Sequence, residues 1–443
     1  MQPHYNTRTW DMPHASPLIE LTIEKPAVGG RMIARHHGRV VLVSSAIPGE
    51  RVVARVERAG RDVAYAVVTE VLEPDRDRRP VVGDPACGGN VYAHVAYDRQ
   101  LALKSAIVAD AFARIGRVGL DAPVPVAPSK ERGYRMRARL HVRGTRIGFV
   151  REGSHELCDA ARTGQLLPET GAVLDRLSGA MRAIRPVAVR GLDLAENLAA
   201  DQRVLHFELE PDGAGDGAQL AALGRVEGVT GLTAAPSRGA PRALLAGAPY
   251  VSDPLSAIVP SVAGARGTPE LRRHAAAFFQ GNRYLLPRLV SRVIEHVSSG
   301  EIVELYAGVG VFAVALAAAG RGPVTAVEGD SVSAADLQAN AASFAEVLRV
   351  EHAPVEAYLR RRTGPPAGTL VIDPPRTGLS REAIAGVIRH GAARIVYVSC
   401  DVATLARDVR KLVDAGHMLS QIEAFDLFPN TAHVEVLAVL VKA

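Results

Sequence analysis

The sequence of 443 residues is 48% hydrophobic and 22% charged, which excludes wholesale disorder and indicates two or three folded domains. It contains no run of about 18 apolar residues and no apolar signal segment at the N-terminus, so neither a transmembrane helix nor secretion is expected. The net charge of +5 is concentrated in residues 1–150, which hold 23 Lys and Arg against 15 Asp and Glu, and a basic segment of this kind is typical of polyanion-binding proteins.

A flexible tail is expected for residues 1–17 and a small β-barrel for residues 18–75. In the second segment apolar and polar residues alternate over short stretches, which end at Gly29-Gly30, Pro48-Gly49 and Gly60. Small basic barrels commonly bind oligonucleotides. Together with the charge excess, this pattern predicts an RNA-binding barrel; the alternative is a basic surface that is merely solvated.

Residues 76–265 are predicted to form a mixed α+β middle domain that also binds RNA. Three arginines occupy alternate positions of one predicted strand: Arg135, Arg137 and Arg139. Because successive side chains of a strand point to opposite faces, this strand has one apolar face and one basic face. The basic face predicts contacts with RNA phosphates, and the alternative is salt bridging within the domain.

Residues 266–443 alternate apolar, β-branched runs with helical patterns. Four runs predict buried strands: EIVELYAG, VTAVEGD, TLVIDPP and RIVYVSC. The pattern indicates a parallel sheet with helices on both faces, a doubly wound α/β domain. Two closing runs, IEAFDLFP and HVEVLAVLVKA, predict a hairpin that adds an antiparallel strand at the sheet edge. Ligands of such sheets bind beyond the carboxyl ends of the strands.

The first two of these strands end in features of a nucleoside site. Gly308 and Gly310 follow the first strand, where glycine lets the backbone approach a ligand closely. Glu328 ends the second strand 20 residues after Gly308, a spacing at which an acid reaches ribose hydroxyls. Neither the phosphate loop of nucleotide hydrolases nor the complete dinucleotide motif is present. The pattern therefore favours a nucleoside without a pyrophosphate, such as S-adenosylmethionine.

The later strand ends carry reactive side chains. Asp373 follows the third strand, and Cys400 ends the fourth, where a thiol is a candidate nucleophile and not only a core residue. Glu435 enters the last strand between apolar residues. It is either an exposed edge charge or a general base in the same cleft.

Six motifs resemble, in order and spacing, those of the RNA 5-methyluridine methyltransferase family: FFQGNRY, ELYAGVGVF, AVEGD, DPPRTGL, YVSCD followed by TLARD, and DLFPNTAHVE. The barrel, with IPGERVVARV, resembles the TRAM domain of that family. The resemblance covers residues 18–443. It implies a class I methyltransferase fold for residues 266–443, with S-adenosylmethionine as the cofactor.

The resemblance also implies roles for individual residues. Cys400 corresponds to the nucleophile and Glu435 to the general base. The corresponding cofactor-pocket residues are Gln280, Tyr306, Glu328 and Asp373, beside the loop glycines Gly308 and Gly310. The implied activity is methylation of a uridine at carbon 5, with ribosomal RNA favoured over transfer RNA. The alternative to an enzyme is an RNA-binding protein that has the same fold but no catalytic activity.

Three departures from the family pattern stand out. Family members carry four cysteines that bind an iron–sulfur cluster, and only one of these positions, Cys87, is a cysteine here. The other three hold Val81, Asn90 and Thr163. One thiolate cannot hold a four-iron cluster, so no cluster is expected. The usual asparagine after the Gly-x-Gly is Val311. Asp401 follows the nucleophile and would raise its pKa if the carboxylate faced the sulfur.

The remaining polar residues predict little. Three cysteines in a chain of this length argue against a disulfide framework, and Cys158 is interpreted as a small buried hydrophobic residue. His155 and Glu156 have no further ligand nearby, so no metal site is expected. We expect a cytoplasmic monomer without a membrane partner.

Overall fold

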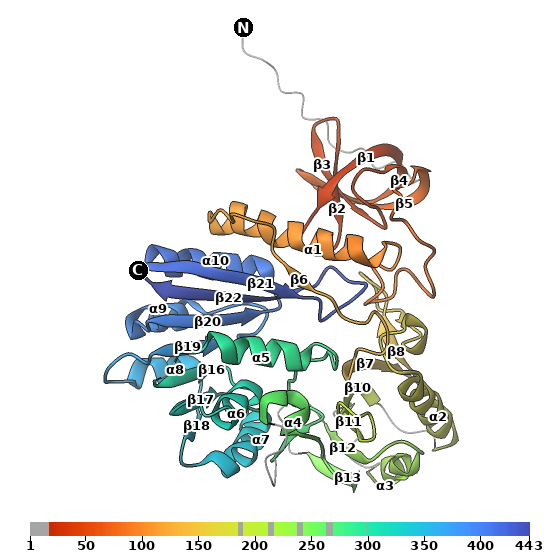
Figure 1. The fold of residues 1–443 in the computed structure, drawn as a ribbon. Coiled ribbons are helices and arrows are strands. Elements are labelled where there is room, and N and C mark those ends of the chain that lie inside the picture. Colours follow the sequence, from red (N-terminus) through yellow and green to blue (C-terminus); the bar gives the residue numbers. More distant parts are fainter. Residues whose placement is uncertain (1–16, 185–188, 211–216, 237–241, 263–268, 299) are drawn as a thin grey trace.

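The computed structural model describes residues 17–184, 189–210, 217–236, 242–262, 269–298 and 300–443. The tail predicted for residues 1–17 lies, up to residue 16, outside the described residues. Within them the chain forms an N-terminal barrel, a middle sheet and a C-terminal sheet. Helix α1 (Tyr97–Ala111) lies between the barrel and the C-terminal sheet (Figure 1).

The N-terminal barrel confirms the prediction from alternating residues. Five strands close it in the order β1-β2-β3-β5-β4. Alternate side chains such as Leu21 and Ile23 fill its interior, while the residues between them face solvent. The strands are β1 (Leu18–Pro26), β2 (Met32–His36), β3 (Arg39–Ser44), β4 (Arg51–Ala59) and β5 (Val63–Glu73).

The middle domain is built on a seven-stranded sheet in the order β13-β12-β11-β10-β7-β8-β9, against which helix α2 (Pro168–Ile184) packs. Strand β7 buries Ala138, Leu140 and Val142 on one face, as the alternation predicts. The other elements are β7 (Arg137–Arg143), β8 (Arg146–Val150), β9 (Leu157–Cys158), β10 (Val189–Glu196), β11 (Arg203–Leu209), α3 (Gly217–Ala221), β12 (Gly231–Ala235) and β13 (Ala243–Gly247). A short pair, β14 (Tyr250–Pro254) and β15 (Glu270–His274), and helix α4 (Leu255–Ile258) lead to the C-terminal domain.

The C-terminal sheet confirms the doubly wound α/β prediction. Its order is β18-β17-β16-β19-β20-β22-β21-β6, and β18 through β20 run parallel whereas β22 runs antiparallel between β20 and β21. The strands are β6 (Val126–Ala127), β16 (Ile302–Leu305), β17 (Val324–Glu328), β18 (Leu348–His352), β19 (Thr369–Ile372), β20 (Arg394–Ser399), β21 (His417–Phe425) and β22 (Glu435–Lys442).

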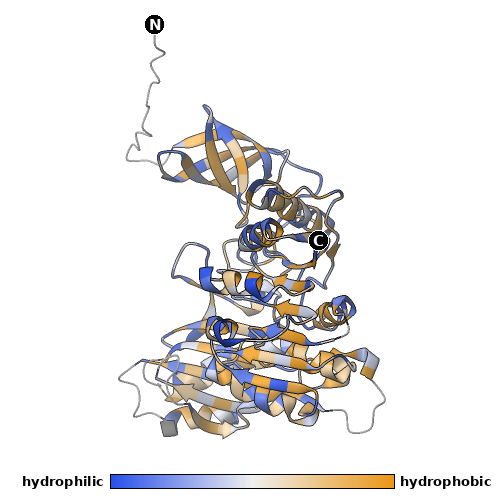
Figure 2. Ribbon diagram, turned by 90° about the vertical axis from the view of Figure 1, so that its left-hand side faces the viewer, coloured by the Kyte–Doolittle hydropathy of each residue, from blue (hydrophilic) through white to orange (hydrophobic). Residues whose placement is uncertain are grey.

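Helices cover both faces of this sheet and enclose two hydrophobic cores. One core includes α5 (Leu286–His296), α6 (Val311–Ala318) and α7 (Ser331–Ala341). The other includes α1, α8 (Val355–Arg361), α9 (Arg381–His390) and α10 (Val402–Asp414). The strands between them are mainly hydrophobic, as Figure 2 shows. Among the described residues, none of the helices combines the length and apolar character that a membrane crossing requires.

The beginning of the predicted middle domain packs elsewhere. Helix α1 shares a core with α10, and β6 pairs with β21 at the edge of the C-terminal sheet. Val108 and Phe112 are fully buried in that core. The helical spacing of apolar residues predicts the helix, but it does not tell which sheet the apolar face covers.

A disulfide joins Cys87 to Cys158, so the interpretation of Cys158 as only a small buried hydrophobic residue was wrong; the expectation of no disulfide framework did not foresee this single bond. The two residues are 71 positions apart in sequence, yet their Cα atoms lie 5.7 Å apart. The reason is tertiary: a β-bridge between Cys87 and Arg151 brings the loop after the barrel against the β8–β9 hairpin. Cysteine spacing alone carries no information on such a contact.

Candidate active site

The carboxyl ends of β16, β17, β19 and β20 lie at one edge of the C-terminal sheet, and β22 begins there because it runs in the opposite direction. The register of β20 and β22 pairs Ser399 with Val436. Cys400 follows Ser399 directly and Glu435 directly precedes Val436, so both residues lie at this end of the paired strands. The predicted nucleophile and base are neighbours, because the charge of Glu435 acts on the thiol of Cys400.

The environment of Cys400 disfavours its thiolate. Cys400 is a partly exposed free thiol. Burial raises its pKa to about 12, and the carboxyl groups of Glu435 and Asp373 add to this effect. Arg376 acts in the opposite direction, because its positive charge and its hydrogen bond to the sulfur stabilise the thiolate. Sequence reasoning did not assign a role to Arg376.

Glu435 is 1% exposed, and its Oε1 atom has no hydrogen-bond partner among the described residues. Burial, followed by the charge of Asp373, raises the pKa of Glu435 well above its ordinary value. Groups with strongly shifted pKa values that lie together in a cleft are candidates for acid–base chemistry.

Asp401 does not account for the raised pKa of the nucleophile. Its side chain is the N-cap of α10 and accepts a hydrogen bond of 2.9 Å from the amide of Thr404. This departure from the family pattern therefore serves the start of a helix, where a carboxylate also interacts favourably with the helix dipole.

A narrow cavity beside these groups gathers four of the predicted cofactor residues: Gln280, Tyr306, Gly308 and Asp373. The amide of Gln280 donates a hydrogen bond of 3.1 Å to Asp373 Oδ2. Burial nevertheless raises the pKa of Asp373 to about 7. Phe312 of α6 closes the cavity on its apolar side.

The glycine loop and Glu328 are joined directly. The amide of Gly308 donates a hydrogen bond of 2.7 Å to Glu328 Oε2, and Asp330 donates to the other oxygen at 2.6 Å. Gly310 has φ +90°, and a Cβ there would lie 2.4 Å from Leu337 Cδ1, so only glycine fits this turn. The spacing was interpreted as placing Glu328 at the ribose hydroxyls of a ligand; the structure shows its carboxylate bonded to the loop, and the ribose contact stays a prediction.

Glu304 also lines the cavity and was not predicted. It is 1% exposed, its Oε2 atom lacks a partner among the described residues, and burial raises its pKa well above the ordinary value. An acid inside the otherwise apolar run EIVELYAG was the available signal, because an unpaired buried carboxyl is costly and therefore informative.

The segment before β22 is held by α1. Lys104 is fully buried, pairs with the carboxylate of Asp426, and donates to the carbonyl of Phe428 at 3.0 Å. Gln100 and Asn430 exchange two hydrogen bonds of 2.9 Å. These residues fix the approach to Glu435, and a lysine within an apolar helical face was the signal for them.

The three arginines of the predicted basic face already have protein partners. Arg135 bonds Gln165 and the carbonyl of Arg137. The Nε atom of Arg137 donates to Ala277 O at 2.9 Å, and Arg139 pairs with Asp193 at 3.0 Å and with Glu208. Arg139 therefore forms the salt bridges within the domain that were the alternative to RNA binding. An RNA contact by these three arginines stays a prediction.

The positions of the family's cluster cysteines do not fit an iron–sulfur cluster. Cys87 is bonded to Cys158, and the side-chain amide of Asn90 donates to the carbonyls of Val82 and Asp84 at 3.3 and 3.1 Å. Val81 and Thr163 offer no sulfur. Among the described residues, no group of three or more His, Cys, Asp or Glu side chains is placed to hold a metal ion.

Comparison with known proteins agrees with this arrangement. Residues 364–443 match the family model for tRNA (Uracil-5-)-methyltransferase, and residues 18–69 match the TRAM domain. The chain is 31% identical to the 23S rRNA (uracil(1939)-C(5))-methyltransferase RlmD of Pseudomonas putida over 99% of this chain and 96% of that protein. It is also 31% identical to an uncharacterized RNA methyltransferase of Thermosynechococcus vestitus, over 95% and 97% of the two chains.

The fold is shared with a solved structure. The tRNA (uracil-54, C5)-methyltransferase of Pyrococcus abyssi, crystallised in complex with S-adenosyl-L-homocysteine, superposes with a TM-score of 0.72 at 22% identity. The match covers 95% of this chain and 99% of that chain. The barrel, middle domain and C-terminal sheet therefore occur together in another protein.

Proposed function

This chain belongs to the family of RNA uracil-C5 methyltransferases, and on that premise we propose that it transfers a methyl group from S-adenosylmethionine to carbon 5 of a uridine in ribosomal RNA. The observation that carries the proposal is that Cys400 and Glu435 adjoin the paired residues Ser399 and Val436 at the ligand edge of the sheet, where the carboxyl acts on the thiol. A silent RNA-binding protein would have no use for a free thiol and a buried carboxyl in this arrangement.

S-adenosylmethionine supplies an electrophilic methyl group on a sulfonium. The residues that line the narrow cavity suit such a ligand in kind, because they combine the polar side chains of Gln280 and Asp373 with the apolar ring of Phe312. Gln280, Tyr306, Gly308, Gly310 and Asp373 would hold the cofactor with Glu328, whose carboxylate the loop amide of Gly308 already orients. The unpartnered Oε2 atom of Glu304 is an acceptor for a positively charged or N–H group of the ligand.

The thiolate of Cys400 forms a bond to carbon 6 of the uracil, and the electron pair of the ring double bond moves toward carbon 5 and the carbonyl at carbon 4. Carbon 5 would then take the methyl group as the bond from that methyl to the sulfonium breaks and its electron pair stays on the cofactor sulfur, which leaves S-adenosylhomocysteine. Glu435, as a carboxylate, removes the proton from carbon 5, the ring double bond reforms, and the bond from sulfur to carbon 6 breaks. Arg376 supports the first step by stabilising the thiolate.

We assign the RNA to the ribosome because the relative that matches over nearly the whole chain methylates 23S ribosomal RNA. Transfer RNA is the second candidate. The barrel, residues 18–75, and the middle domain, residues 76–265, would bind the RNA, with the arginines of β7 as the first contacts to test. A protein with this substrate works in the cytoplasm, and we expect a monomer.

The test compares the full-length protein with a Cys400→Ala variant on unmodified 23S ribosomal RNA and on transfer RNA. The variant should form no 5-methyluridine, measured by nucleoside mass spectrometry, and bind S-adenosylhomocysteine within a few-fold of the unsubstituted protein. RNA that contains 5-fluorouridine should trap a covalent adduct at Cys400, because fluorine cannot leave as a proton. Full turnover by the variant, or an adduct at another residue, would refute the assignment.

A further inference from the structure

A pocket of about 390 Å³ lies where the barrel, the middle domain and the catalytic segment meet. Gly29 of the barrel forms one side and Gly88 and Gly89 of the following loop another. The β8–β9 hairpin, residues 151–155, and residues 431–433 complete the lining. Pockets that bind small ligands span roughly 300–1,000 Å³, so this one has room for a single group of nucleoside size.

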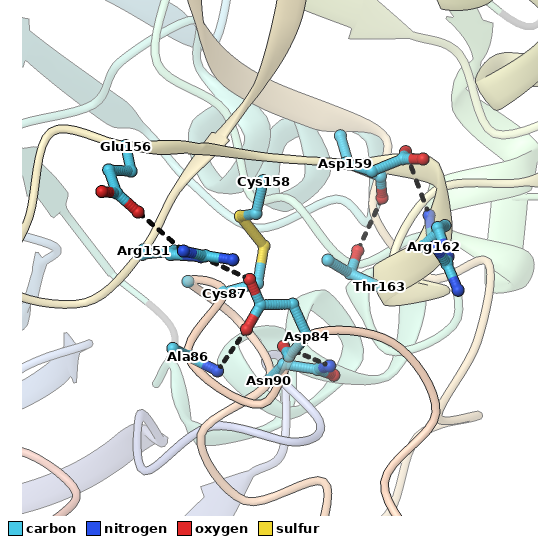
Figure 3. The surroundings of a disulfide bond; sticks show 12 residues. Asp84, Ala86, Cys87, Asn90, Arg151, Glu156, Cys158, Asp159, Arg162 and Thr163 are labelled. Atoms are coloured by element: carbon cyan, nitrogen blue, oxygen red, sulfur yellow. Dashed lines mark hydrogen bonds and ion pairs between the residues drawn. A yellow bond between two sulfur atoms is a disulfide. The ribbon is translucent and has the colours of Figure 1, made fainter.

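The Cys87–Cys158 disulfide joins two walls of this pocket. Figure 3 shows the bond beneath the hairpin, with the side chain of Arg151 between Asp84 and Glu156. The ion pairs of Arg151 with these acids are each 2.6 Å long. Two backbone hydrogen bonds complete the contact, from Gly88 to the carbonyl of Val150 at 3.0 Å and from Glu152 to the carbonyl of Ala86 at 2.7 Å. The exposed ion pairs contribute little, so the covalent bond is the main fastening between loop and hairpin.

The chemistry of the lining favours a nucleobase. Two imidazoles, His155 and His433, offer flat surfaces on which a base can stack. The glycine walls leave the backbone within reach of base edges. Arg151 is already neutralised by its two acids, and Glu152 adds a negative charge, so a phosphate is disfavoured inside the pocket. A carboxylate can, however, accept a hydrogen bond from an exocyclic amine of a base.

The pocket is next to the proposed chemistry. His433 lies two residues before Glu435, and its imidazole interacts electrostatically with the guanidinium of Arg376. An enzyme that acts on a base must take its target out of the stack, which leaves the neighbouring nucleotides unstacked as well.

We propose that this pocket receives the base of a nucleotide that flanks the target uridine, and that the Cys87–Cys158 disulfide keeps its walls together, so that RNA affinity depends on the redox state of this one pair. The proposal rests on the proposed function. Disulfides in a reducing compartment are usually transient or redox-sensing, and ribosomal RNA is modified in such a compartment. A dithiol supplies the two electrons and two protons that convert the disulfide to two thiols, and is itself oxidised to a disulfide.

The test measures equilibrium binding of an unmodified 23S ribosomal RNA transcript to the full-length Cys400→Ala protein at fixed salt, so that no adduct forms. Reduction with dithiothreitol should raise the Kd about tenfold, because the loop and hairpin must then be ordered on binding. A Cys87→Ser/Cys158→Ser variant should bind as weakly and ignore the reductant. His155→Ala should weaken binding by the oxidised protein several-fold, whereas His352→Ala, on the distant strand β18, should not.

Two controls separate the outcomes. Affinity for S-adenosylhomocysteine should stay close to that of the oxidised protein, which shows that the C-terminal domain is intact, whereas the thermal midpoint should fall because a stabilising disulfide is lost. An unchanged Kd after mass spectrometry has shown both thiols free, or a His155→Ala protein that binds normally, would overturn this inference and leave the methyltransferase assignment standing. A protein with Cys400 that methylates neither ribosomal nor transfer RNA would instead overturn the proposed function.

Discussion

The buried ion pair between α1 and the catalytic segment gives a sharp prediction. Lys104 and Asp426 are both fully buried, and no other cation of the described chain pairs with Asp426. Lys104→Met keeps the length of the side chain but removes the ammonium group. The carboxylate of Asp426 is then left in the core without a counter-charge, and the carbonyl of Phe428 loses one of its donors.

Removal of one partner from a buried ion pair costs about 3–5 kcal/mol, out of the roughly 5–15 kcal/mol that stabilises a typical folded protein. We expect the free energy of unfolding, measured in urea at neutral pH, to fall by about that amount. Methylation should fall more steeply than cofactor binding, because the segment that Lys104 holds leads into Glu435 while the cofactor cavity lies on other strands.

Lys411→Met is the matched control, since Lys411 is exposed on α10 and its substitution should change stability by no more than about 0.5 kcal/mol. The double variant Lys104→Met/Asp426→Leu should recover most of the loss, because it removes both charges. A single Lys104→Met variant as stable as the control would refute the reasoning and show that Asp426 is not held as a buried carboxylate.

Three further predictions concern the active site. Alkylation of Cys400 by iodoacetamide requires the thiolate, and the pKa of this thiol is about 12. The alkylation rate should therefore rise about tenfold per pH unit through the neutral range, and it should be slower in the Arg376→Gln variant. A rate that does not depend on pH would contradict this. Glu435→Gln should accumulate a denaturation-resistant complex with uridine RNA, visible on gels, because the thiol adds but the carbon-5 proton stays. Burial raises the pKa of Asp373 to about 7, so the folded state binds the proton more tightly than the unfolded state. The stability of the unsubstituted protein relative to Asp373→Asn should therefore fall as pH rises from about 4 to about 7 and then level off in urea titrations.

The fold was predictable where local pattern and tertiary contact agree. Strict alternation gave the barrel strands, and apolar runs separated by helices gave the C-terminal sheet. The packing of α1 against that sheet and the pairing of β6 with its edge were not predictable, because an amphipathic helix does not encode which sheet covers its apolar face. The disulfide was not predictable for the same reason, since Cys87 and Cys158 are brought together only by the packing of a loop on a hairpin.

Within the site, residues at strand ends were easier to find than residues that support them. The spacing of Gly308 and Glu328 marked both as candidate site residues, and the structure joins them by a hydrogen bond that the spacing did not predict. Glu304 and Lys104 were missed because a single polar residue in an apolar run looks like an exception to a pattern. That these two side chains are buried, and which partners they have there, can be seen only once the neighbouring helices and strands are in place.

The antiparallel pairing of β20 with β22 has a consequence for how this site can vary. Cys400 and Glu435 adjoin Ser399 and Val436, the last paired residues of this β-ladder, so the register of the two strands sets which side chains meet at this end of the sheet. Insertion of a single residue into either strand would turn one of the two side chains to the opposite face of the sheet. Loops that meet the RNA can thus change in length and sequence between homologues without disturbing the reacting pair, whereas the strands that carry it cannot gain or lose a residue.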